Sequence, residues 1–234
     1  MIVLQFDGGY AHWGLLMLRS LALHEPGQKV LVDGVNLSPK QWAEVSQAHP
    51  RVTLRKTREE TSPERMANRK PLVLQRVMDE HPEEPWYCLM DADFLVRRPM
   101  PDLWNLMRRA DAALIVTDGV WEGRVYQHLI TVSSLVMVRP SGRPLIDRWA
   151  RWTAHKRAIA GIRPGAWFWD QVTLLKARNG TPLTYAVIPI GDFADCGFHP
   201  DTAIWSAHVS FEDKERCYAL FFEEHERQAA ESSV

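Results

Sequence analysis

The sequence predicts an α/β fold in which a mostly parallel central sheet is flanked by helices. Short apolar runs alternate with segments of helical periodicity, a pattern typical of βα units whose strands lie parallel in one sheet. The chain has 234 residues, enough for one sizeable core. Hydrophobic residues make up 46% and charged residues 24%, as in an ordinary globular protein. We therefore expect one domain over residues 1–234.

The elements follow from apolar runs, helical spacing and breakers. A glycine turn follows the first run, and Ser38 before Pro39 is typical of a helix start. Pro71 is placed to begin another helix, and the polar stretch 57–70 before it reads as a loop or a short helix. The predicted strands are 2–6, 29–35, 51–57, 86–90, 110–117, 130–138 and 184–190. The predicted helices are 11–24, one from Ser38, 71–81, 101–109, 144–160, 167–177 and the charged C-terminal tail.

Charge and cysteine content exclude several classes of protein. The formal net charge is −1, so the chain as a whole offers no general attraction to nucleic acid or to an anionic membrane. Its three cysteines are widely spaced, which suggests neither a disulfide framework nor a zinc site and fits a reducing compartment. No apolar run is long enough to span a membrane. We expect a cytoplasmic protein with a small-molecule partner.

Two carboxylates follow the apolar run 86–90, at Asp91 and Asp93. Residues two apart on a strand share a face and lie roughly 6.5 Å apart, so both could address one ion. A hard cation such as Mg²⁺ or Mn²⁺ binds one or two carboxylates and completes its shell with water and phosphate oxygens. Asp is also common where a strand turns, so the pair could instead cap the strand.

Two basic residues, Arg69 and Lys70, immediately precede Pro71. Cations are disfavoured beside a helix N-terminus and anions are favoured there. A phosphate between them would account for the arrangement, and two solvated side chains are the alternative. Asp33 is placed at the end of the second strand, where ligands of open α/β sheets collect, so it is a candidate for contact with a nucleoside.

An aromatic cluster opens a late helix, where Trp167, Trp169, Asp170 and Gln171 lie close together. Aromatic rings can pack on the apolar faces of a sugar while a carboxylate accepts its hydroxyl protons. Core aromatics with a carboxylate at a helix N-terminus form the alternative.

The segment WYCLMDADFLVRRPMPDLW resembles the metal-binding Asp-x-Asp segment of GT-A fold, nucleotide-sugar-dependent glycosyltransferases. The resemblance to the group of glycogenin and bacterial galactosyltransferases implies a GT-A-like domain and a set of site residues. Asp91 and Asp93 would bind Mn²⁺ or Mg²⁺ with His208. The nucleotide diphosphate would be held by Asp7, Tyr10, a basic residue near Lys70, and Lys214. Asp170 would be catalytic, and Trp167, Trp169 and Gln171 would meet the acceptor.

The sequence departs from the family pattern at three positions. Ser133 and Leu135 stand where the family has Asn and Gly, and Phe211 stands where it has Gly between His208 and Lys214. The resemblance implies sugar transfer, with a UDP-sugar as the expected donor and retention of anomeric configuration. Two other readings stay open: a non-catalytic nucleotide-sugar binding protein, and a phosphatase of the haloacid dehalogenase class, which also uses Asp-x-Asp after an apolar strand.

Overall fold

A seven-stranded sheet forms the centre of the molecule, with strand order β10-β6-β9-β4-β1-β2-β3. The structure is a computed structural model that describes residues 1–121, 123–189, 201–206 and 210–231. The strands of this sheet are β1 (Ile2–Asp7), β2 (Val30–Val35), β3 (Val52–Thr57), β4 (Tyr87–Met90), β6 (Ala112–Val116), β9 (Thr131–Val138) and β10 (Tyr185–Ile188). Two small sheets pair β5 (Leu95–Val96) with β11 (Ile204–Trp205) and β7 (Val120–Trp121) with β8 (Arg124–Val125).

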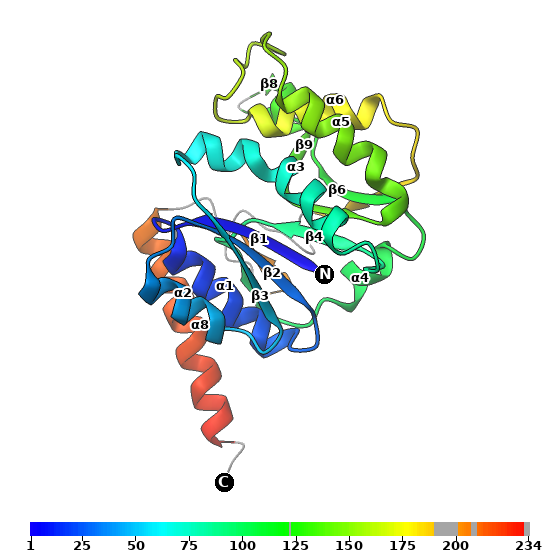
Figure 1. The fold of residues 1–234 in the computed structure, drawn as a ribbon. Helices are drawn as coiled ribbons and strands as arrows, with labels where there is room; N and C mark the ends of the chain where they lie inside the picture. Colours follow the sequence, from blue (N-terminus) through cyan, green and yellow to red (C-terminus); the bar gives the residue numbers. More distant parts are fainter. Residues whose placement is uncertain (122, 190–200, 207–209, 232–234) are drawn as a thin grey trace.

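Helices cover both faces of the large sheet (Figure 1). The α-helices are α1 (Ala11–His24), α2 (Pro39–Gln47), α3 (Pro63–Glu80), α4 (Pro101–Leu106), α5 (Arg143–Thr153), α6 (Trp169–Asn179) and α8 (Phe211–Glu231), with short 3-10 turns η1 (Gln127–Leu129) and η2 (Pro140–Gly142). This arrangement confirms the predicted α/β class with a mostly parallel sheet.

The directions of the strands decide which strand ends lie at the same edge of the sheet. Neighbouring strands pair in parallel except β9, which is antiparallel to both β4 and β6. The carboxyl ends of β1 to β4 therefore lie at one edge of the sheet, and the start of β9 lies at that same edge. In open α/β sheets this edge is where ligands bind.

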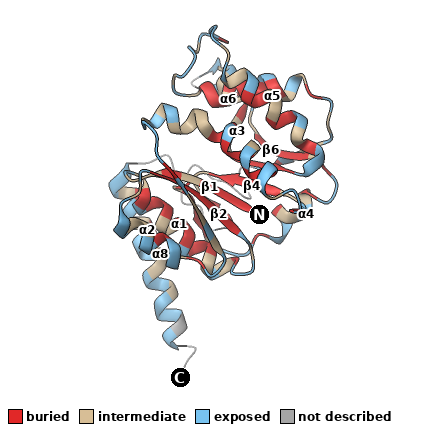
Figure 2. Ribbon diagram, in the orientation of Figure 1, coloured by how far each residue is buried: buried red, intermediate tan, exposed pale blue. Residues whose placement is uncertain are grey.

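The core lies in two layers, one on each face of the sheet. On β1, Ile2 and Leu4 belong to the cluster packed under α1, α2 and α4, whereas Val3 belongs to the cluster packed under α3, α5 and α6. Side chains of a strand alternate between faces, so one strand supplies both layers. Figure 2 shows the buried strands between half-exposed helices.

The third helix differs from the prediction. Ser62 caps its N-terminus by accepting a hydrogen bond from the Arg65 amide at 3.2 Å, and Pro63 occupies the first turn. Pro71 is therefore inside α3 and does not begin it. Proline was the misleading signal, because it usually ends or begins a helix. The predicted helix N-terminus beside Arg69 and Lys70 is wrong, and so is the helix-dipole argument for a phosphate there.

Other differences lie between elements. The helix predicted to reach residue 160 ends at Thr153, and the β7–β8 hairpin lies between the predicted strands 110–117 and 130–138. Gly180 follows α6 with φ at −104°, so this helix does not end in a left-handed glycine cap. His208 and residues 191–200 lie outside the described residues.

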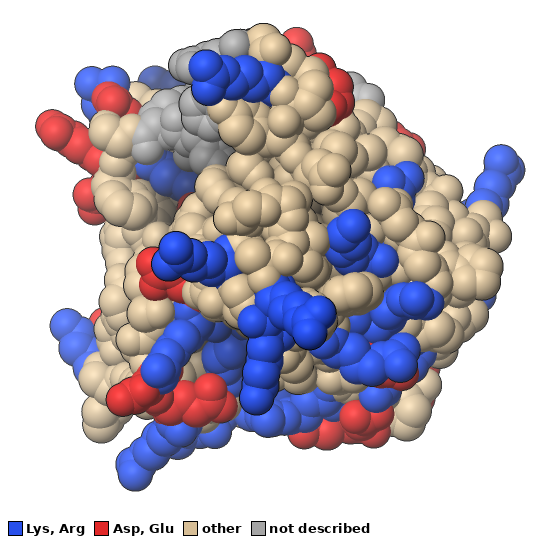
Figure 3. Space-filling view, turned by 90° about the horizontal axis from the view of Figure 1, so that it is seen from above, with Lys and Arg blue, Asp and Glu red and all other residues tan. Residues whose placement is uncertain are grey.

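Charge is spread unevenly over the surface. Lys and Arg are distributed across the face seen from the side of α5 and α6, while Asp and Glu lie mainly toward its edges (Figure 3). The far half of α8 extends away from the body in Figure 1 and is largely exposed. Within the described residues, no helix is both long and apolar enough to span a bilayer.

Candidate functional site

The Asp-x-Asp residues lie in a turn directly after β4. The strand ends at Met90, the Asp91 amide donates to Ser134 O on β9 at 2.8 Å, and the Phe94 amide donates back to Asp91 O at 3.4 Å. The same-face strand argument is therefore wrong, since the chain has already turned. Both carboxylates still face the carboxyl edge of the sheet, and each side chain keeps 30% of its accessible surface.

Lys70 lies between two carboxylates that are distant in the sequence. Its Nζ is 2.8 Å from Asp91 Oδ1 and 3.3 Å from Asp170 Oδ2. Nζ also donates to Ser133 Oγ at 3.4 Å, and the Ser133 hydroxyl donates to Asp170 Oδ2. Lys70, Ser133 and Asp170 are buried and Asp91 keeps part of its surface, so these four side chains form one polar network that reaches the surface at Asp91.

The network shifts proton affinities. Burial raises the pKa of Asp91 to about 6, with Asp93 adding to the rise and Lys70 opposing it. Burial alone would lower the pKa of Lys70, but Asp91 and Asp170 more than offset this, and the net shift is upward. A lysine that stays charged while buried makes physical sense only with such anionic partners.

Asp93 is held by residues from the start of α8. Lys214 Nζ lies 2.7 Å from Asp93 Oδ2, and Tyr218 donates its hydroxyl hydrogen to Asp93 O at 2.7 Å. The Lys214 ammonium also lies 5.6 Å from the Trp13 ring, within reach of a cation–π contact. Burial, and then the charge of Asp93, raises the pKa of Tyr218. The C-terminal helix thus reaches the Asp-x-Asp turn.

The loop after β1 also borders the site. Asp7 Oδ1 accepts hydrogen bonds from the amides of Gly9 and Tyr10 at 3.0 and 3.1 Å, which orders the turn. Burial raises the pKa of Tyr10, with the charges of Asp93 and Asp91 contributing next, so the Tyr10 phenol lies within electrostatic reach of both carboxylates. Asp7 orders this turn, and its contact with the nucleotide stays a prediction.

Asp33 is not where the sequence suggested. It lies within β2, is fully buried, accepts from Thr57 Oγ1 at 2.8 Å and pairs with Arg69 at 3.1 Å. Arg69 also pairs with Glu59 at 2.9 Å. Residues of a strand alternate between faces, and this one points into the layer beneath α3. The prediction that Asp33 meets a nucleoside is corrected, because no surface of its side chain is accessible.

The aromatic residues before Asp170 divide between surface and core. Trp169 is completely buried and donates its indole hydrogen to Thr153 O at 2.8 Å, so its assignment to the acceptor is wrong. Trp167 is 50% exposed and remains a candidate. Gln171 is half-buried, and its Oε1 accepts no hydrogen bond from the described residues. Trp149 donates to Asp170 O at 2.9 Å and so fixes the start of α6.

The donor set at Asp91 and Asp93 suits a hard divalent cation. The lysine contacts use Oδ1 of Asp91 and Oδ2 of Asp93, and among the described residues nothing hydrogen-bonds to the second oxygen of either carboxylate. Two carboxylate oxygens facing solvent match what Mg²⁺ or Mn²⁺ takes from protein. No cluster of three His, Cys, Asp or Glu with metal-binding geometry occurs in the described part of the chain, and the predicted third ligand, His208, lies outside it.

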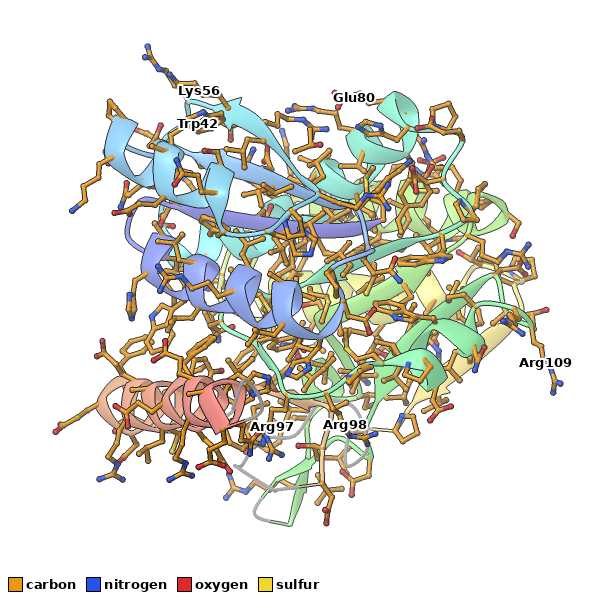
Figure 4. The ribbon with its side chains drawn as sticks, turned by 90° about the horizontal axis from the view of Figure 1, so that it is seen from below. Trp42, Lys56, Glu80, Arg97, Arg98 and Arg109 are labelled. Atoms are coloured by element: carbon orange, nitrogen blue, oxygen red, sulfur yellow. The ribbon has the colours of Figure 1, made fainter. Side chains whose placement is uncertain are left out.

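Two open hollows flank the carboxyl ends of β2 and β3. One of about 490 Å³ lies near Asn36, Trp42 and Lys56, with the Lys56 ammonium 6.0 Å from the Trp42 ring; Figure 4 shows these two side chains at one corner. The other, about 520 Å³, lies between Arg69 and Gly165. Neither is lined by Asp91 or Asp93, so both lie beside the carboxylate network and not at it.

Sequence reasoning missed two residues of the site. Ser133 was noted only as a departure from a family pattern, yet its hydroxyl joins Lys70 to Asp170. The signal was its position at the start of an antiparallel strand, which only the strand order reveals. Tyr218 was not named from the sequence, because nothing local in the sequence indicates its contact with Asp93.

Comparisons with known proteins concern the fold of this chain. No protein-family model and no curated protein matches the sequence. Solved structures do match. The galactosyltransferase LgtC in complex with donor and acceptor sugar analogs is 12% identical, with 95% of this chain and 94% of that chain covered and a TM-score of 0.60. A glycosyltransferase involved in glycosylation of the major capsid of PBCV-1 is 11% identical, with 93% and 98% covered and a TM-score of 0.62.

A third match is the apo structure of the bifunctional glycosyltransferase WbbM, 13% identical with a TM-score of 0.55. The match covers 95% of this chain and 44% of WbbM, so this chain spans less than half of that protein. At these identities the likeness concerns the backbone. The chain has a GT-A-like glycosyltransferase fold.

Proposed function

We propose that this chain is a glycosyltransferase that moves a sugar from a nucleotide diphosphate sugar, a UDP-sugar first among the candidates, to an acceptor hydroxyl with the help of Mn²⁺ or Mg²⁺. The observation that carries the proposal is Lys70, which joins Asp91 of the Asp-x-Asp turn to Asp170 at the carboxyl edge of the sheet. In this proposal residues 1–234 act as one cytoplasmic domain.

Charge accounts for the roles of the donor-side residues. Breaking the bond between sugar and diphosphate leaves negative charge on the departing diphosphate, and cations placed there lower the barrier. Lys214, 2.7 Å from Asp93, would neutralise part of that charge. A divalent ion bound by Asp91, Asp93 and His208 would supply further neutralisation when bound. Tyr10, in the loop after β1, would pack against the nucleoside.

Asp170 would act beside the transferred sugar. Its carboxylate is buried and held by Ser133 and Lys70, so its position is fixed before any ligand arrives. Preorganised charge of this kind stabilises the positive charge that develops on the sugar as its bond breaks. Trp167 and Gln171, on either side, would meet the acceptor. The resemblance to the group of glycogenin supports retention of the anomeric configuration.

Two alternative functions, a phosphatase and a non-catalytic binding module, would give different results in activity assays. A haloacid dehalogenase-type phosphatase places its Asp-x-Asp after the first strand of the domain, whereas here β1, β2 and β3 precede it, which favours glycosyl transfer. A non-catalytic binding module would bind the donor and turn nothing over. Release of phosphate from aryl phosphates would favour the phosphatase, and donor binding without transfer to any of a broad acceptor panel would favour the module.

The test is calorimetric binding of UDP, GDP and ADP to wild type and to Asp91→Asn, Asp93→Asn and His208→Ala, in Mn²⁺ and in EDTA. Asn keeps the size of Asp and one oxygen that can accept from the neighbouring lysine. We expect one nucleotide to bind only with Mn²⁺, each Asp variant to lose at least tenfold in affinity, and His208→Ala to lose less.

The matched control is Asp102→Asn, an exposed acid on α4. It should bind as wild type does. Radiolabelled sugar transfer with the nucleotide sugar that binds best then tests turnover. If the wild type bound the nucleotide equally well in Mn²⁺ and in EDTA, the assignment of the metal site would be wrong, and most of the case for glycosyl transfer would be lost with it.

A further inference from the structure

The segment between α5 and α6, residues 154–168, is a tightly turned surface loop. The Ile159 amide donates to Ile162 O at 3.0 Å and the Ile162 amide donates to Ile159 O at 2.9 Å, so the two residues between them form a two-residue turn. Ala160 and Gly161 there have φ of 51° and 80°. A non-glycine residue in this region is strained by roughly 1 kcal/mol, and such strain collects at functional sites.

Apolar contacts fix the loop to the body. Ile159 is buried, and it and the half-buried Ile162 pack in one cluster with Trp169 and Val172 of α6. The loop is therefore held in place on the same helix that carries Asp170. Its polar side chains are presented outward from a fixed backbone.

Three of those side chains are cations. Lys156, Arg157 and Arg163, which we call the basic turn, are all exposed. Within the described residues, none of the three has an ion pair or a side-chain hydrogen bond. Three neighbouring cations without acidic partners repel one another, a cost that an anionic ligand would relieve.

A row of aromatic rings lies beside the basic turn. His128 stacks on Phe168 with ring centroids 4.8 Å apart, Tyr126 lies 5.4 Å from His128, and Trp167 lies 6.1 Å from Phe168. We call these four residues the aromatic row. Trp167 is 50% exposed and the other three keep part of their surface. Phe168, with φ of 66°, leads directly into α6 two residues before Asp170.

We propose that the acceptor of this protein is an anionic saccharide, whose sugar rings pack on the aromatic row and whose carboxylate or phosphate groups meet the basic turn. Sugar C–H faces pack on aromatic rings, and guanidinium groups bind carboxylate and phosphate in pairs of hydrogen bonds. The donor diphosphate belongs at Lys214, so this second cationic surface serves another molecule. The inference rests on the proposed glycosyl transfer and names the class of its acceptor.

The test measures binding of matched oligosaccharides: oligogalacturonate against neutral oligogalactose, and mannose 6-phosphate oligomers against neutral oligomannose. We expect at least one anionic probe to bind tenfold or more tightly than its neutral match at low salt. The triple variant Lys156→Gln, Arg157→Gln, Arg163→Gln should lose that preference. Trp167→Ala should weaken the anionic and the neutral probe together, because it removes a packing surface and no charge.

The control is Arg76→Gln, Arg108→Gln, Arg109→Gln, which removes the same charge from exposed positions elsewhere; Figure 4 shows Arg109 at the periphery. It should keep the preference. UDP binding in Mn²⁺ should be unchanged in both triple variants. A wild-type protein that does not bind UDP would instead count against the proposed function. Equal affinity for charged and neutral probes, no binding of either, or tighter binding of single-stranded RNA than of any glycan would overturn the anionic acceptor.

Discussion

The ammonium of Lys70 lies 2.8 Å from Asp91 Oδ1, and each of these two groups favours the charged form of the other. Removing one partner of a buried ion pair leaves an uncompensated charge, which typically costs about 3–5 kcal/mol. We expect Lys70→Met to lower the free energy of unfolding by about 3 kcal/mol and to abolish sugar transfer, with urea denaturation as the measurement. Adding Asp91→Asn to Lys70→Met should recover part of the stability, and a purely additive double variant would contradict the pairing.

Asp170→Asn tests the buried carboxylate beside Lys70. The substitution keeps the size of the side chain and its contact with Ser133, so nucleotide affinity should survive. Sugar transfer should fall by a factor on the order of 10² or more, as expected for lost electrostatic or acid–base assistance. Steady-state rates at saturating donor measure the effect. Full activity would limit Asp170 to holding Lys70 and the start of α6.

Lys214→Met tests the cation at the start of α8. Lys214 is 3% exposed, so Met preserves the packing of its stem against Trp13 while removing the charge. We expect nucleotide diphosphate affinity in Mn²⁺ to fall about tenfold, equal to about 1.4 kcal/mol. Lys40→Met, on the exposed face of α2, is the control and should bind normally. If Lys214→Met bound the nucleotide diphosphate as tightly as wild type does, Lys214 would not contact the diphosphate.

His24 predicts a pH dependence of stability. Its ring lies 5.1 Å from that of His225 on α8, and burial, with a contribution from His225, lowers the pKa of His24 to about 4. Between pH 6.5 and 4 the unfolded chain then binds more protons than the folded one, so this residue's contribution to stability falls as pH falls through that window.

The measurement is the difference in unfolding free energy between wild type and His24→Gln at pH 7.5 and at pH 5. Wild type should lose about 1 kcal/mol relative to the variant on acidification, since the group is partly exposed and the full shift is screened. His155→Gln serves as the control. A pH profile unchanged by His24→Gln would show that the pairing with α8 does not depend on the charge of His24.

Gly142 is required by close packing. A Cβ there would lie 2.3 Å from Val138 Cγ2 and 2.5 Å from Asp111 O. The Asp111 carbonyl is fixed because it accepts from the Arg139 amide at 2.9 Å. We expect Gly142→Ala to cost about 1–3 kcal/mol in thermal or urea unfolding. Gly27→Ala, where a Cβ meets nothing within 4 Å, should be neutral, and equal losses in both would contradict the packing argument.

Sequence patterns predicted the strands and most helices because periodicity and apolar runs are local. Helix 11–24 was predicted with its observed bounds, and the strand after it within one residue. The prediction failed at α3, which begins after the Ser62 cap and continues through Pro71. It also failed for Trp169 and Asp33, whose burial leaves no side-chain surface for a ligand. The burial of a residue depends on which elements pack over it, and the local sequence does not show this.

The candidate site was predicted only as far as its residues resemble a known pattern. Asp91, Asp170, Lys70 and Lys214 were all named from the sequence, but Lys70 was named for a reason that the structure removes. Its contacts with Asp91 and Asp170 depend on the pairing of distant strands. Ser133 could not be found at all until β9 was known to run against its neighbours.

The reversed direction of β9 also has a consequence for how the chain reaches its native state. Strand β2 pairs with the strands that precede and follow it in the chain, β1 and β3, whereas β9 lies between β4 and β6 and joins the two parts of the sheet. Non-local pairing of this kind closes long loops and forms slowly. Ser133 stands near the beginning of β9, so the contacts among Asp91, Lys70 and Asp170 become complete in the same step that closes the sheet. An incompletely folded chain would therefore lack the arrangement altogether, and the kinetics of β9 insertion would set when activity first appears during refolding.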